Sequence, residues 1–84
     1  MNMLTEHEAT QIALDALRGK NIPFREQSAV RKLINQQHNM LYPIWRVSLD
    51  IPMPLNMQDE YFTVEINALS GAVIGIITPT GSIT

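Results

Sequence analysis

The sequence predicts an α+β fold in which one N-terminal helix packs on a three- to four-stranded antiparallel sheet. Three observations support this prediction: a capped amphipathic segment at residues 6–18, a strand-like alternation at residues 44–51, and a second alternation at residues 61–68 that a tight turn joins to residues 72–78. A helix laid across one sheet face is the simplest way to bury both apolar sides. The 84 residues make a single domain, in which residues 79–84 are expected to be a frayed tail.

The helix prediction depends on its two ends and on its apolar stripe. Thr5 and Glu8 have the spacing of a capping box, in which each side chain accepts a hydrogen bond from the backbone N–H of the other residue. Gly19 suits the end of a helix, and Pro23 forbids its continuation. Five apolar residues recur at helical spacing and predict the buried face: Ala9, Ile12, Ala13, Ala16 and Leu17.

Two segments alternate between apolar and polar residues, as half-buried strands do. The apolar series are Trp45, Val47, Leu49 and Ile51 in the first segment and Phe62, Val64 and Ile66 in the second. We expect Trp45 and the second series to meet the helix. Gly71 lies in the turn before the last strand, where its freedom to adopt a positive φ is useful.

Residues 28–34 fit two different structures. A helical stripe with Ser28 as its N-cap and a twisted strand both match the four apolar residues Ala29, Val30, Leu33 and Ile34. Periodicity alone does not decide between these two alternatives.

Three motifs between residues 4 and 77 carry a family likeness. They are Leu4-Thr5-Glu6-x-Glu8-Ala9-x-x-Ile12-Ala13, then Trp45-x-Val47, and finally Tyr61-x-x-Val64-x-Ile66-Asn67-Ala68-x-x-Gly71-x-Val73. This set resembles PepSY-like domains, and it is similar to a family of bacterial immunity proteins with a nuclear-transport-factor-like fold. The resemblance implies a bacterial protein with a PepSY- or cystatin-like arrangement of helix and sheet. It also implies a strand at residues 28–34.

The composition argues against several functional classes. The chain has no cysteine, which excludes disulfides, thiolate catalysis and cysteine metal sites. Its net charge of −2 gives no basic footprint for nucleic acid, and no apolar run approaches the ~20 residues of a membrane span. Residues 1–8 lack the basic start and apolar run of a signal peptide. We therefore expect a cytoplasmic protein that binds neither nucleic acid nor membranes.

The titratable residues form no catalytic constellation in the sequence. His7 stands next to Glu8, and helix neighbours one residue apart do not face each other. His38 has no carboxylate or cysteine near it, while Asp50 and Glu65 fall on polar strand faces where solvated charges are expected. We expect no enzyme activity and no catalytic, cofactor-binding or metal-binding residue.

Two apolar connections indicate a binding surface. Loops are usually polar, whereas methionine-rich apolar loops adapt well to partners. The candidate partner-binding residues are Met40, Tyr42, Met53, Leu55 and Met57. Alternatively, the arm at residues 52–57 folds back and closes the small core.

The sequence therefore predicts a non-enzymatic protein-binding module of the immunity or inhibitor type, which occupies a protein partner such as a toxin or an enzyme by surface complementarity. One alternative is a homo-oligomeric structural or small-ligand-binding domain, because the final strand is apolar on both faces and could pair in a homodimer. Another is a small hydrolase or metal site in an oligomeric cleft.

Overall fold

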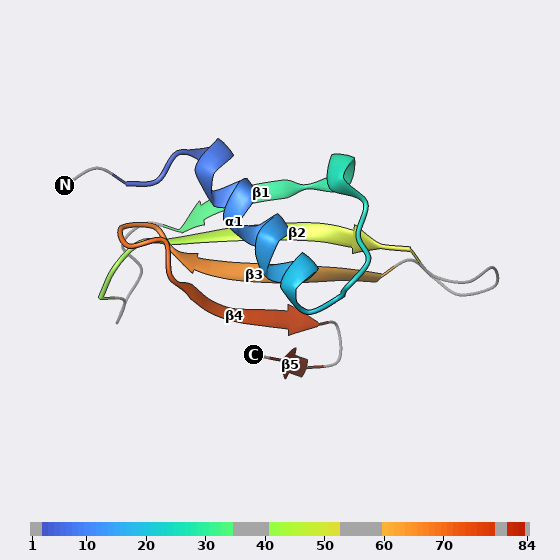
Figure 1. The fold of residues 1–84 in the computed structure, drawn as a ribbon. Coiled ribbons are helices and arrows are strands. Elements are labelled where there is room, and N and C mark those ends of the chain that lie inside the picture. The colour runs from blue at the N-terminus through green and yellow to red at the C-terminus, as the bar shows by residue number, and fades with distance from the viewer. Residues whose placement is uncertain (1–2, 35–40, 53–59, 79–80, 84) are drawn as a thin grey trace.

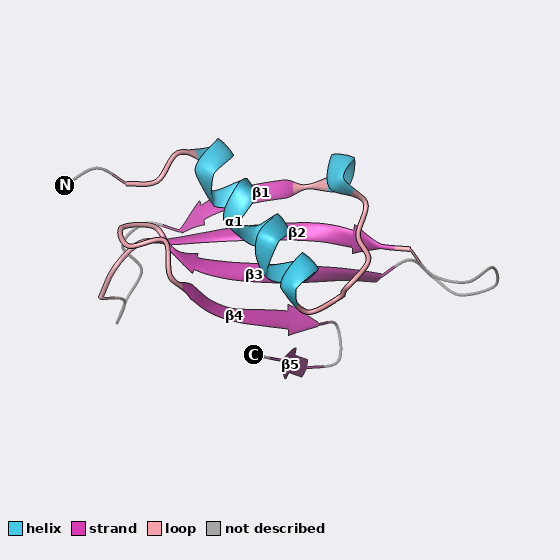
Figure 2. Ribbon diagram, viewed as in Figure 1, coloured by secondary structure: helices cyan, strands magenta, loops and turns pink. Residues whose placement is uncertain are grey.

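The computed structural model describes residues 3–34, 41–52, 60–78 and 81–83. Its elements are the helix α1 (Glu6–Gly19), a 3₁₀ turn (Glu26–Ser28) and the strands β1 (Val30–Ile34), β2 (Ile44–Ile51), β3 (Glu60–Asn67), β4 (Val73–Thr78) and β5 (Gly81–Ile83). The strands lie in the order β1-β2-β3-β4-β5, and each neighbouring pair is antiparallel. α1 crosses one face of this sheet (Figures 1 and 2). The predicted α+β fold is confirmed.

Local hydrogen bonds define both ends of α1. The Glu8 N–H donates to Thr5 Oγ1 at 3.1 Å and the Thr5 N–H donates to Glu8 Oε1 at 2.8 Å, which confirms the capping box. The other end differs from the prediction, because Gly19 is the last helical residue and the left-handed residue is Asn21, with a φ of 59°. Asparagine tolerates this conformation, and its N–H donates to the Arg18 carbonyl at 3.0 Å.

The buried face of α1 is displaced from the predicted stripe. Its fully buried apolar residues are Ala9, Ala13, Leu14 and Leu17. Leu14, which the predicted stripe omits, is only 1% exposed, whereas Ile12 and Ala16 are half-buried at the rim of the core. The predicted stripe and the buried stripe share three residues, so helical periodicity alone does not distinguish between them. The crossing of α1 over β2 and β3 selects the face that contains Leu14.

The apolar series of β2 and β3 share the face that α1 covers, as predicted. The directly paired residues are Trp45 with Ile66, Val47 with Val64, and Leu49 with Phe62. Val47 and Leu49 are fully buried in one cluster with α1 and with Ile76 of β4. Trp45 is half-buried, and its Nε1 donates to the Leu4 carbonyl at 3.0 Å.

β1 resolves the segment that fitted two structures. Residues 30–34 pair with residues 44–48 of β2, so they form a strand, as the resemblance implies. Just before β1, Ser28 fixes the approach to the sheet. Its Oγ accepts a hydrogen bond from the Asp50 N–H at 2.8 Å and donates one to the Arg25 carbonyl at 2.6 Å.

The tail prediction needs a correction. Residues 81–83 form β5 rather than a frayed end, and they pair with residues 76–78 of β4. An uncovered strand edge offers unpaired N–H and C=O groups, which a following segment can satisfy. β5 therefore pairs with the outer edge of β4 along residues 76–78.

Candidate functional site

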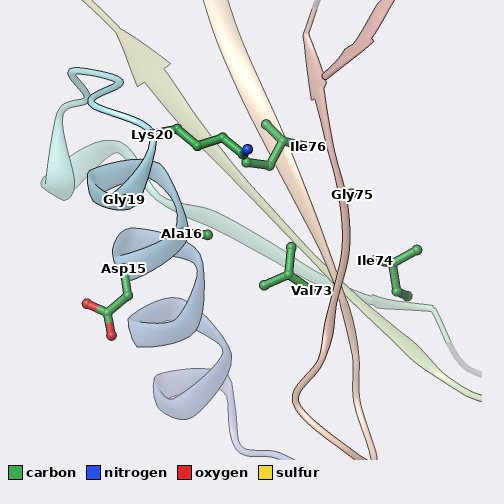
Figure 3. A pocket seen from close by; sticks show the side chains of 8 residues that line it. All are labelled: Asp15, Ala16, Gly19, Lys20, Val73, Ile74, Gly75 and Ile76. Atoms are coloured by element: carbon green, nitrogen blue, oxygen red, sulfur yellow. The ribbon is translucent and has the colours of Figure 1, made fainter. Parts of the chain in front are cut away.

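A groove of about 310 Å³ separates the last turn of α1 from β4. The residues that line it are Asp15, Ala16, Gly19, Lys20, Val73, Ile74, Gly75 and Ile76 (Figure 3). α1 packs mainly on β2 and β3, so its C-terminal turn leaves part of β4 uncovered. We call this surface the α1/β4 groove.

Small residues keep the α1/β4 groove open. Ala16 and Gly19 form the helix wall and fill little of the space between the two elements. A methyl group at Gly19 would meet no other atom within 4 Å, so this part of the groove is accessible rather than tightly packed. Gly75 likewise contributes no side chain to the strand wall.

A β-bulge shapes the strand wall of the groove. The pairs on either side of it are Glu65 with Gly75 and Ile66 with Val73, which leaves Ile74 as the extra residue of β4. A bulge bends its strand and changes the direction of the side chains around it. Val73 points towards α1, while Ile74 points away from it (Figure 3). They are 43% and 39% exposed, so the bulge presents two large apolar side chains to solvent.

The charged residues lie at the rim of the groove. The Lys20 side chain extends across the opening towards Ile76, whereas the Asp15 carboxylate points away (Figure 3). Asp15 lies 3.6 Å from Arg18, in an exposed ion pair along the helix. Lys20 makes no ion pair with any carboxylate of the described residues. The groove therefore combines an apolar floor with one amine at its opening.

A second apolar surface lies at the end of the sheet where β2 begins. The backbone bonds from Leu4 N–H to the Ala68 carbonyl (2.8 Å) and from Ala68 N–H to the Pro43 carbonyl (2.9 Å) bring three segments together there. The exposed apolar residues of these segments are Met3, Leu41 and Leu69, at 39%, 94% and 38% exposure.

The structure describes one of the five predicted partner-binding residues. Tyr42 is half-buried at this end of the sheet, next to the exposed Leu41. Met40, Met53, Leu55 and Met57 lie outside the described residues. Tyr42 and Pro52 flank β2 at its opposite ends, separated by an eight-residue strand of about 25 Å. The described residues next to the two predicted apolar segments therefore lie at opposite ends of β2.

The titratable residues remain dispersed in the structure. Within residues 3–34, 41–52, 60–78 and 81–83, no three His, Cys, Asp or Glu side chains come close enough to hold a metal ion. Asp50 is opposite Tyr61, whereas Glu65 is opposite Arg46 and pairs with it at 3.4 Å, so the two acids do not meet. The hydrogen bond from the Thr5 backbone N–H lowers the pKa of Glu8 below its ordinary value. His38 lies outside the described residues.

The sequence does not reveal the α1/β4 groove, because the bulge that shapes its strand wall leaves no local pattern. Residues 72–78 read as one strand that is apolar on both faces, and this pattern does not reveal a bulge at Ile74. The only signal is the surplus of apolar residues in that strand, a pattern that self-association would also explain.

None of the helices in the described part of the chain has the length and apolar character of a membrane span. Compared with family models, curated proteins and solved structures, the chain matches none of them, so the resemblance to PepSY-like domains stays a prediction from the sequence motifs.

Proposed function

We propose that the chain is a non-enzymatic protein-binding module, and that its α1/β4 groove receives an apolar side chain of the partner. The observation that carries this proposal is the exposure of Val73, which points towards α1 on the strand wall of a groove of about 310 Å³. Binding energy at protein interfaces concentrates where a large side chain of one protein fills a pocket of the other. The scaffold around the groove suits this role, because β4 pairs with β3 beside the groove and α1 is anchored on the core.

Filling the groove would supply part of the binding energy. Burying the remaining exposed surface of Val73 contributes about 1 kcal/mol, before any contribution from the partner's own side chain. A volume of about 310 Å³ is at the lower limit of small-molecule sites, and it is large enough for one aliphatic or aromatic side chain. The groove therefore fits an anchor residue of a protein better than a whole metabolite.

The partner class we propose is a toxin or an enzyme that the chain inhibits by occupying its surface. The support for this class is the likeness of the capped helix, the tryptophan strand and the glycine-turn hairpin to bacterial immunity proteins. The sheet-end surface around Leu41 and Tyr42 offers a second contact area on the same molecule. Met40, Met53, Leu55 and Met57 stay predicted contacts.

Affinity capture with variant chains tests the proposal. Val73→Asp places a charge on an exposed groove residue, while Gln11→Glu adds the same charge to an exposed position of α1 outside the groove. Wild type and Gln11→Glu should capture the same protein from the native host, identified by mass spectrometry, and Val73→Asp should lose it. Equal capture by all three chains would rule out the groove as the contact. Capture of no protein, together with co-purification of a small apolar compound, would favour the small-ligand alternative.

A further inference from the structure

The sheet face opposite α1 carries a second hollow, which we call the open-face groove. It has a volume of about 250 Å³ and is lined by Val30, Lys32, Arg46, Ser48, Tyr61 and Thr63. These residues come from the three adjacent strands β1, β2 and β3. They alternate with residues that face α1, such as Val47 and Val64, and so they point to the other side of the sheet.

The floor of the open-face groove is polar. Ser48 lies opposite Val30 on one side and opposite Thr63 on the other. The Ser48 and Thr63 hydroxyls are 2.8 Å apart and share a hydrogen bond, and Thr63 is only 5% exposed. The two hydroxyls of the floor therefore already have a hydrogen-bond partner in each other, so a ligand would be recognised by the side chains around them.

The open-face groove carries uncompensated positive charge. Lys32 lies directly opposite Arg46, an arrangement of like charges that destabilises a pair of strands. Glu65 compensates Arg46 from the next strand, with 3.4 Å between Arg46 Nε and Glu65 Oε2. That contact is an ion pair without a hydrogen bond, so the buried Nε has no hydrogen-bond partner. Lys32 has no carboxylate within ion-pair distance among the described residues, and no acid lines the groove.

Two exposed apolar side chains stand beside these cations. Val30 is 66% exposed and Tyr61 is 56% exposed, which are high values for large apolar residues within paired strands. A ligand for this surface therefore needs a negative group for Lys32 and an apolar group for Val30 and Tyr61. A protein segment with an acidic residue next to an aliphatic one has both.

Other ligand classes fit the open-face groove less well. A nucleic acid requires a row of cations along its phosphates, whereas this groove has two cations, one of which Glu65 already compensates. A free metabolite is usually buried over most of its surface, which a hollow of about 250 Å³ on an open sheet face does not achieve.

We infer that the open-face groove binds an acidic segment of a protein partner, with a carboxylate at Lys32 and an aliphatic side chain against Val30 and Tyr61. This inference rests on the proposed function, since it requires that the chain binds protein. It adds a third contact surface, on the opposite side of the sheet from α1, and it specifies the chemistry of the partner.

A titration followed by nuclear magnetic resonance tests the inference with defined probes. The probe is the peptide acetyl-Glu-Ile-Glu-Ile-Glu-amide, its control is the same peptide with glutamine in place of glutamate, and inorganic phosphate represents a free anion. The acidic peptide should shift the amide signals of Ser48, Tyr61 and Thr63, and its binding should weaken as salt is raised. Lys32→Gln should weaken binding about two- to fivefold at low salt, the range of an exposed ion pair. Lys32→Arg should restore it.

A matched variant and three outcomes make this test decisive. Arg25→Gln removes one positive charge from an exposed residue outside both grooves, and it should leave the affinity unchanged. Equal binding of the glutamine peptide, equal binding by Lys32→Gln, or phosphate binding as tight as that of the peptide would each overturn the inference. The α1/β4 proposal is tested separately, because Val73→Asp changes neither Lys32 nor the residues around it.

Discussion

Trp45 of β2 donates its indole N–H to the backbone carbonyl of Leu4, 3.0 Å away. The Leu4 N–H in turn donates to the Ala68 carbonyl at 2.8 Å, so the residues before α1 are fixed both to β2 and to the turn that follows β3. Since the capping box begins at Thr5, directly after this double anchor, the start of α1 is set by the sheet as well as by its own cap.

Trp45→Phe tests this anchor. Phenylalanine keeps most of the aromatic contact but removes the N–H donor, so we expect a loss of about 1–2 kcal/mol in the free energy of unfolding. Urea denaturation followed by circular dichroism measures it, because Trp45 is the only tryptophan of the chain and its fluorescence is lost in the variant. An unchanged denaturation midpoint would show that the hydrogen bond to Leu4 contributes nothing to stability.

Leu14→Ala and Ile12→Ala test which face of α1 is buried. Leu14 is 1% exposed in the core, and its truncation should cost about 2–4 kcal/mol by loss of apolar burial and formation of a cavity. Ile12 lies half-buried at the rim, so the same change there should cost about 1 kcal/mol. Thermal and urea denaturation of both variants give the two values. A larger loss at Ile12 would support the stripe predicted from periodicity instead.

Alanine substitution at two glycines should change the stability of the chain in opposite directions. Gly71 has a φ of 82°, and an added Cβ would lie 3.4 Å from Ile12 Cδ1, so Gly71→Ala should destabilise the chain by about 1–2 kcal/mol. Gly19 is the last helical residue, and an added Cβ would meet no atom within 4 Å apart from its chain neighbours and the helix backbone, so Gly19→Ala should stabilise the chain by about 0.5–1 kcal/mol. The melting temperature of each variant, compared with that of wild type, checks the two expectations. Equal effects would contradict the assigned backbone conformations.

Glu8 gives the stability of the chain a defined dependence on pH. The hydrogen bond from the Thr5 backbone N–H lowers the pKa of Glu8 in the folded state, and hydrogen bonding with the Thr5 side chain lowers it further. A lowered folded-state pKa contributes stability above the unfolded value, and this contribution is lost as the pH falls through the folded value. The contribution should therefore be present at pH 7 and decline below about pH 4.5.

Glu8→Gln isolates this contribution. The variant keeps an oxygen acceptor for the Thr5 N–H but carries no charge to titrate, so its stability relative to wild type should improve as the pH is lowered from 6 to 3. Urea midpoints measured across this range test the expectation. Parallel curves for the two proteins would show that the Glu8 carboxylate is not coupled to folding.

The sequence predicted those features that depend on near neighbours. The capping box of Thr5 and Glu8 and the alternation around Val47 and Val64 are local patterns with a direct physical meaning, and the structure confirms both. The strand at residues 30–34 was decided by family resemblance rather than by periodicity, because its apolar spacing also suits a helix.

The remaining features depend on how the elements pack together. Burial of Leu14 follows from the angle at which α1 crosses the sheet, and pairing of residues 81–83 follows from the uncovered edge of β4. The α1/β4 groove requires both that crossing and the bulge at Ile74, and neither leaves a periodic signal in the sequence. The candidate site was therefore out of reach of pattern analysis, although its apolar residues were visible.

The most direct test of the central claim is the affinity of the purified partner for three versions of the chain, measured by isothermal titration calorimetry. If the partner binds in the α1/β4 groove, Val73→Asp should weaken binding at least about tenfold, equivalent to ~1.4 kcal/mol, while Gln11→Glu should bind like wild type. Circular dichroism establishes that the variants remain folded. A dissociation constant for Val73→Asp equal to that of wild type would contradict the proposal that this groove receives the partner.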